Sequence, residues 1–219
     1  MADETGGAPE RRMPLFRRQA IEGAPGTLRL EELAFAAKFI LRLDPQAGGE
    51  AFGAATGLDL PPAPLMSVVN GERAVLWLGP DEFLVLAPEG EAAGLADAVA
   101  SGLKDVHHQF TEVSDYYTCI AVEGPKARKA LMKLTTLDLH PRAFSVGTVA
   151  GSNFAQAQGW LWLEHEAEGA ARFRLYVRWS MAEYLWGTLA EAGREWGLPE
   201  QEPVTGEPML TESVTSRKA

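Results

Sequence analysis

The amino-acid sequence predicts an α+β fold of two similar modules with antiparallel sheets, because one pattern of elements occurs twice along the chain. The pattern contains a Leu-Asp-Leu triplet, found at 58–60 and again 79 residues later at 137–139. Each triplet is followed by a strand centred on tryptophan, at Trp77 and at Trp162. A supersecondary unit that occurs twice predicts two modules that share one core.

The first module is expected to begin with an apolar strand over 33–43. Asp44 is a good helix cap, Pro45 fits the first helical turn, and Gly57 is typical of the position just beyond a helix end. Turn residues between two apolar runs then predict a hairpin. Its strands cover 74–78 and 83–87, and a helix follows over about 90–103.

The second module repeats this order, starting with a helix that Pro125 opens. Its apolar residues fall on one helical face, and they are Ala127, Ala130, Leu131 and Leu134. We expect the cations off that face to be solvated, namely Lys126, Arg128, Lys129 and Lys133.

A strand over 172–179 follows, with Phe173, Leu175, Val177 and Trp179 on one side and Arg172, Arg174, Tyr176 and Arg178 on the other. Ser180 and Glu183 have the spacing of a capping box, so we expect a helix from there to about Trp196, ended by Gly197.

These elements divide the chain into four segments. Polar, Gly- and Pro-rich residues 1–26 predict a flexible N-terminal arm, and residues 199–219 predict a flexible C-terminal tail. The first α+β module covers 27–106 and the second covers 107–198.

Composition limits the classes of function. A net charge of −10 over 219 residues argues against nucleic-acid binding, which selects basic proteins. The single cysteine, Cys119, excludes a disulfide framework and is expected to be a buried apolar residue in a strand. No apolar run reaches membrane-spanning length and no signal-peptide core follows the N-terminal arginines, so we expect a cytoplasmic protein with no membrane partner.

The sequence contains no recognisable catalytic or metal constellation. Adjacent His107 and His108 would point to opposite sides of a strand, and His165 lies in an acidic stretch expected to be a solvated turn. Zinc-type ligand spacing, a phosphate-binding glycine loop and a nucleophile elbow are all missing. We therefore expect no catalytic, cofactor-binding or metal-binding residues in this chain.

Two polar features stand out as candidates for docking to a partner. The first is the segment after the second triplet, in which Asp138, His140, Arg142 and Phe144 either pin a sharp loop to the helix end or contact a partner. The second is the arginine face of Arg172, Arg174 and Arg178, because several guanidinium groups on one sheet face suit carboxylates of another chain or an anionic ligand.

Residues 74–84, 137–144 and 173–178 give the sequence a resemblance to a known family. In this order they resemble the gamma subunit of heterotetrameric sarcosine oxidase, over roughly residues 28–198. The octet Leu-Asp-Leu-His-Pro-Arg-Ala-Phe at 137–144 is the most specific of the three segments. The resemblance also implies a fold related to the folate-binding region of glycine-cleavage aminomethyltransferases.

The resemblance implies a non-catalytic subunit with alpha, beta and delta partners. In such complexes alpha carries NAD and the tetrahydrofolate site, beta carries FAD and covalent FMN, and delta carries zinc. The complex demethylates sarcosine to glycine and passes the one-carbon unit to tetrahydrofolate. Two alternatives stay open: a gamma-like subunit of N-methylglutamate dehydrogenase, and a free-standing tetrahydrofolate-binding module whose arginine face meets a glutamate tail. An enzyme using Asp138 and His140 is a third reading.

Overall fold

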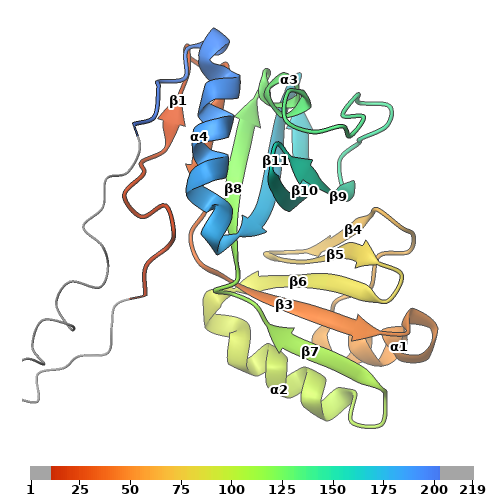
Figure 1. The fold of residues 1–219 in the computed structure, drawn as a ribbon. Coiled ribbons are helices and arrows are strands. Elements are labelled where there is room, and N and C mark those ends of the chain that lie inside the picture. The colour runs from red at the N-terminus through yellow and green to blue at the C-terminus, as the bar shows by residue number, and fades with distance from the viewer. Residues whose placement is uncertain (1–10, 203–219) are drawn as a thin grey trace, which may run out of the picture.

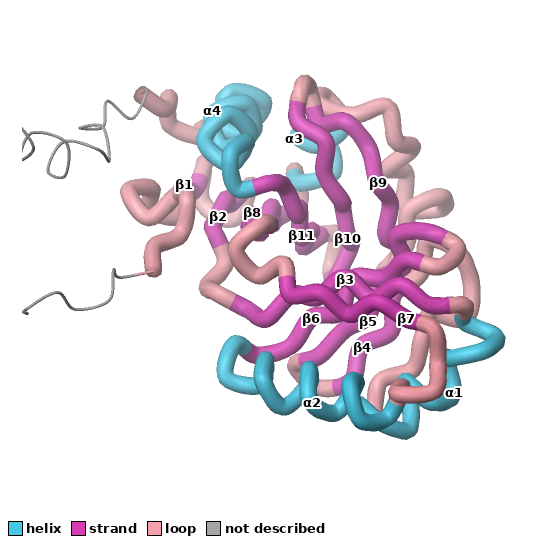
Figure 2. The backbone as a smooth tube through the Cα atoms, turned by 60° about the horizontal axis from the view of Figure 1, so that its bottom comes forward, coloured by secondary structure: helices cyan, strands magenta, loops and turns pink. Residues whose placement is uncertain are grey.

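The computed structural model describes residues 11–202, which form two antiparallel sheets packed face to face between two layers of helices (Figure 1). Figure 2 shows helices α1 and α2 outside one sheet and α3 and α4 outside the other. Strands covered on both faces carry continuous buried residues, as five successive positions of β6 (Glu82–Pro88) do. The predicted α+β class is confirmed.

The five-stranded sheet contains the predicted hairpin, with Trp77 opposite Phe83. Its helices are α1 (Pro45–Thr56) and α2 (Ala92–Gly102), the latter preceded by the short 3₁₀ turn η1 (Glu89–Glu91). The strands in spatial order are β4 (Ser67–Asn70), β5 (Arg73–Gly79), β6, β3 (Ala36–Leu43) and β7 (His108–Glu112).

The six-stranded sheet carries the two other helices, α3 (Ala127–Met132) and α4 (Ala182–Gly193). Short 3₁₀ turns flank α4, η2 (Trp179–Met181) before it and η3 (Arg194–Trp196) after it. Within residues 11–202 no helix has the length and apolar character needed to cross a bilayer. The strands in spatial order are β1 (Ile21–Glu22), β2 (Arg29–Glu32), β8 (Tyr117–Gly124), β11 (Ala170–Arg178), β10 (Ala157–Ala167) and β9 (Val149–Phe154).

The two halves of the duplicated sequence exchange their first strands. β2 precedes β3 in the chain but pairs with β8, and β7 precedes β8 but pairs with β3. The sheets therefore divide the chain differently from the expected modules 27–106 and 107–198. A repeated order of elements in the sequence does not say which copy each strand pairs with, so this exchange is visible only in the structure.

The predicted start and end of α1 are confirmed. The Asp44 carboxylate accepts a hydrogen bond from the N–H of Gln46 at 2.9 Å, and Pro45 occupies the first helical turn. Gly57 closes the helix with φ +70°, and its N–H donates to the carbonyl oxygen of Gly53.

The predicted starts of the two helices in the second module are wrong. Pro125 lies in a turn, and α3 begins only at Ala127. Ser180 does not cap α4, which has no side-chain cap, because η2 runs directly into the helix and the carbonyl oxygen of Trp179 accepts the N–H of Ala182, the first residue of α4. The Glu183 carboxylate is instead paired with Arg18 at 2.8 Å.

Apolar side chains form three layers of core. Two layers lie between a sheet and its helices; Phe173, Leu175 and Val177 belong to one of them, as the strand alternation predicts. Trp179, expected on the same face, lies in η2. The third layer lies between the sheets and includes Leu76, Leu84, Cys119, Trp162 and Tyr176.

Parts of the expected flexible arm and tail are packed against the fold. Leu15 is 1 % exposed, and its N–H donates to the Glu32 carboxylate at 3.0 Å. Near the other end, Gln201 accepts a hydrogen bond from the Trp186 indole at 2.9 Å. The polar composition of these segments did not indicate these contacts with the folded body. The remaining residues of the arm and tail, 1–10 and 203–219, lie outside the described part of the chain.

Candidate functional site

The predicted docking segment forms an exposed loop between α3 and β9. Its turns are held by its own side chains: the Asp138 carboxylate accepts from the N–H of His140 at 3.0 Å, and His140 Nδ1 accepts from the N–H of Arg142 at 3.3 Å. The Arg142 side chain is exposed, and no described residue pairs with its guanidinium. Asp138 and His140 therefore shape the loop, while Arg142 is the group available for intermolecular contact.

Arg128 fixes the same loop from inside. One guanidinium nitrogen donates to the carbonyl oxygens of Leu139 and Phe144 at 2.7 and 3.0 Å, and the other two pair with Glu166 at 2.9 and 2.6 Å. These hydrogen bonds lower the pKa of the Glu166 carboxyl. The expected solvated position is wrong for Arg128, whose side chain is 12 % exposed.

Phe144 is a core residue. It is 3 % exposed and its ring lies 6.1 Å from that of Phe173 under the six-stranded sheet. The expectation that Phe144 contacts a partner is therefore wrong, because the loop turns its aromatic ring inward.

The arginine face is largely neutralised within the chain. The Glu164 carboxylate accepts hydrogen bonds from Arg174 Nε at 2.8 Å and from Arg172 Nε at 3.2 Å. Arg172 also pairs with Glu123 at 2.5 Å. A bulge between Leu163 and His165 places Glu164 where it reaches both arginines. The expected acidic turn around His165 is thus part of strand β10, and its Glu164 carboxylate pairs with two of the guanidinium groups expected to meet another chain.

Arg178 differs from the two other strand arginines. Its side chain is exposed and lies 5.6 Å from the centre of the Tyr116 ring, and no carboxylate of residues 11–202 is paired with it. It remains open to an acidic group from outside.

Exposed apolar side chains gather where the edge strands β4 and β9 meet. The segments leading into these strands touch through a bridge between Met66 and Thr148 and a hydrogen bond from the Ser67 hydroxyl to the carbonyl oxygen of Gly147 at 2.9 Å. Leu65 adopts φ +63°, an unusual conformation for a bulky residue. We call this surface the seam patch; it consists of Leu65, Met66 and Val146, exposed by 46, 42 and 53 %.

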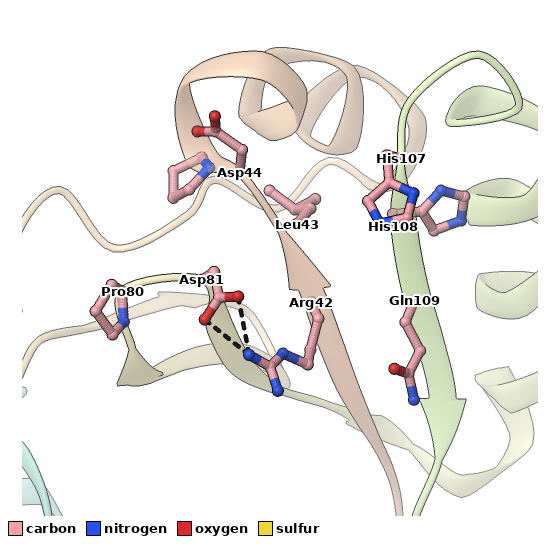
Figure 3. A pocket seen from close by; sticks show the side chains of 9 residues that line it. Arg42, Leu43, Asp44, Pro80, Asp81, His107, His108 and Gln109 are labelled. Carbon is pink, nitrogen blue, oxygen red and sulfur yellow. Dashed lines mark hydrogen bonds and ion pairs between the residues drawn. The ribbon is translucent and has the colours of Figure 1, made fainter.

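A cavity of about 780 Å³ lies at one end of the five-stranded sheet (Figure 3). Arg42 reaches Asp81 there, one nitrogen lying 3.0 and 2.8 Å from the two carboxylate oxygens. His107 and His108 lie beside each other at the start of β7, and His108 Nδ1 is 2.8 Å from the carbonyl oxygen of Val106. Within residues 11–202 no group of three metal-ligating side chains occurs, here or elsewhere.

Cys119 is buried between the sheets, as predicted. Burial raises the pKa of its thiol to about 12, because a thiolate would be poorly solvated there.

We therefore predict that native Cys119 reacts slowly with iodoacetamide from neutral pH up to about pH 10, since the reactive thiolate forms only near the raised pKa. The chain unfolded in urea should be alkylated increasingly as pH approaches the ordinary value of 9.0. Mass spectrometry measures both rates. Native alkylation that rises with the same pH midpoint as the unfolded chain would contradict the prediction.

Comparison with known proteins identifies the family. Residues 43–195 match the family model described as sarcosine oxidase, gamma subunit family. The chain belongs to this family. As a sarcosine oxidase gamma family member, it is 40 % identical over 141 residues to the sarcosine oxidase subunit gamma of Corynebacterium sp. (strain P-1), covering 63 % of this chain and 68 % of that protein.

Solved structures agree with the gamma family assignment. A chain of the heterotetrameric sarcosine oxidase from Corynebacterium sp. U-96 superposes with a TM-score of 0.77 and 32 % identity, covering 88 % of this chain and 99 % of that one. Aminomethyltransferase T of the glycine cleavage system from Bartonella henselae has a TM-score of 0.54 at 14 % identity, over 75 % of this chain and 46 % of that one. The second likeness shows the fold alone, and it confirms the predicted similarity in fold to aminomethyltransferases.

Sequence reasoning missed two features of this gamma family member. Arg128 and Glu164 organise the loop and the arginine face, yet each reads as an ordinary solvated charge. The seam patch was also missed, because its residues come from two segments that are distant in the sequence.

Proposed function

We propose that this chain is the non-catalytic gamma subunit of a heterotetrameric sarcosine oxidase, in which it assembles with alpha, beta and delta subunits. The superposition on nearly the whole length of one chain of such a heterotetramer is the observation that carries this proposal. The complex would demethylate sarcosine to glycine and transfer the one-carbon unit to tetrahydrofolate. FAD, FMN, NAD, tetrahydrofolate and zinc would belong to the other subunits.

Co-expression with the neighbouring subunits tests this function. We expect the chain to copurify with them in fixed stoichiometry, and we expect the chain alone to carry no flavin and to oxidise no sarcosine. Clean separation from the other subunits under gentle conditions, or oxidase activity of the chain alone, would refute the proposal. Oxidation of N-methylglutamate in preference to sarcosine would favour the alternative dehydrogenase.

The docking surface that we propose combines the seam patch with the loop carrying Arg142. Val146 belongs to both, since the loop that contains Arg142 leads directly into it. Exposed apolar groups beside an unpaired arginine have the composition of an interface centre. Asp138 and His140 would support Arg142 in this role. Arg178 is a separate candidate contact. Arg172 and Arg174 remain candidates only through the donors that their internal ion pairs leave free.

Arg142→Ala is expected to weaken assembly by about 2 kcal/mol, roughly 30-fold in the dissociation constant, because truncating an interface arginine removes directional hydrogen bonds. Sedimentation of the co-expressed complex measures the loss, and the specific activity of the fraction that remains assembled should be unchanged. Lys104→Ala, an exposed cation just after α2, is the control. Equal association of the Arg142→Ala and Lys104→Ala complexes would contradict this docking surface.

A further inference from the structure

A second cavity, of about 570 Å³, opens between the two sheets near the segments where the exchanged strands cross. One part of its wall is apolar and includes Leu33, Phe35 and Leu86, while another part carries Lys38, Arg172 and Arg174. An apolar wall facing clustered cations is the composition of a site for an organic anion.

Lys38 is the unusual member of this wall. It is 4 % exposed and lies opposite Leu86 on the β3–β6 ladder. Because the Leu86 side chain belongs to the layer between the sheets, Lys38 lies on that same face. Its ammonium group donates to the carbonyl oxygens of Ala36 and Ser114, both at 3.2 Å. No carboxylate of residues 11–202 forms an ion pair with Lys38, so one N–H is left without a partner, and Asp115 and Glu89 act on the positive charge only from a longer distance.

A buried ammonium without an adjacent counter-ion is costly, and such groups cluster at functional sites. The two carbonyl contacts tie together the crossing segments, but they do not neutralise the charge. Burial accordingly lowers the pKa of Lys38.

The two arginines of the cavity wall are largely balanced by Glu164 and Glu123, so the positive charge that remains in the wall is that of Lys38. Arg172 and Arg174 share Glu164 on one side, and the Tyr176 phenol lies beside Arg174 and Cys119. Of the acidic residues in the wall, Glu72 is exposed and Glu89 is paired with Arg11. These carboxylates do not pair with Lys38.

We propose that this cavity binds a small organic carboxylate with a flat apolar body. The carboxylate accepts hydrogen bonds from Lys38 and from the Arg172 donors that Glu164 and Glu123 leave free, and the body packs against Phe35 and Leu86. This inference goes beyond the proposed function, which requires no ligand in this chain. A failure of one therefore does not refute the other.

Calorimetry on the full-length chain tests the site with three probes: benzoate, acetate and phenol. Benzoate should bind at millimolar or lower concentration, acetate several-fold more weakly because it lacks the body, and phenol not measurably because it lacks the charge. Absence of heat with benzoate, or equal binding of phenol and benzoate, would overturn the proposal.

Substitution locates the site. Lys38→Met should weaken benzoate binding at least tenfold, whereas Lys104→Met, which removes an exposed cation, should leave it unchanged. Arg172→Gln keeps every Lys38 contact and should weaken benzoate binding several-fold. This variant tests the site if Lys38→Met does not fold. Benzoate binding that is unaffected by both Arg172→Gln and a folded Lys38→Met would overturn the assignment to this cavity.

Discussion

Gly124→Ala is expected to destabilise the chain by about 3 kcal/mol or more. Gly124 ends β8 with φ +123°, a conformation that side chains with a Cβ rarely adopt. A Cβ there would lie 2.5 Å from the carbonyl oxygen of Thr27 and 2.9 Å from its carbon. That carbonyl accepts the N–H of Lys126 at 3.1 Å, so it cannot withdraw without breaking the contact that joins the β2 region to the start of α3.

Urea unfolding monitored by tryptophan fluorescence measures this loss, and Gly169→Ala is its matched control. Gly169 also has a positive φ, +80°, but a Cβ there would have no neighbour within 4 Å. We expect the control to lose about 1 kcal/mol, from the backbone conformation alone. Equal losses for the two variants would show that the close approach to Thr27 contributes nothing.

Trp162→Ala should lower the free energy of unfolding by about 3–5 kcal/mol, because it leaves a large cavity between the sheets. Trp162 is 2 % exposed and packs in the central layer, with the Arg174 guanidinium carbon 5.3 Å from its ring centre. Both sheets contribute to that layer, so the loss should appear in the single unfolding transition of the whole chain.

Trp162→Phe separates packing from polarity. The indole N–H of Trp162 is buried, with no hydrogen-bond partner in the described structure. Phenylalanine keeps much of the apolar volume and removes that unsatisfied donor, so we expect a loss below about 1.5 kcal/mol. A Phe variant as unstable as the Ala variant, measured in the same urea titration, would contradict the cavity explanation.

Local signals in the sequence were sufficient where a single segment determines its own structure. Asp44 and Gly57 set the ends of α1 through hydrogen bonds to residues within the same helix, and the alternation of β11 follows from its uniformly apolar face toward the helices. Ser180 failed as a cap because the preceding turn already satisfies the helix start. That competition depends on backbone geometry, which residue types alone do not specify.

The candidate site was less predictable because it is built from residues distant in the sequence. The octet correctly marked an exposed loop, but Phe144 turns inward to meet Phe173. Glu164 meets the strand arginines only because a bulge shifts the β10 register. Lys38 reads as a lone cation in an apolar strand, and nothing nearby in the sequence shows that its neighbours would be carbonyl groups of a crossing segment.

The exchange of β2 and β7 also has a consequence for synthesis of the chain on the ribosome. β2 emerges early with only the two-residue strand β1 beside it until β8 has been translated, and the sheet around β3 stays incomplete until β7 follows. If the gene were divided between β2 and β7, neither half would encode all the strands of one sheet. The nascent polypeptide must therefore keep an unpaired strand edge from aggregating until the second half arrives.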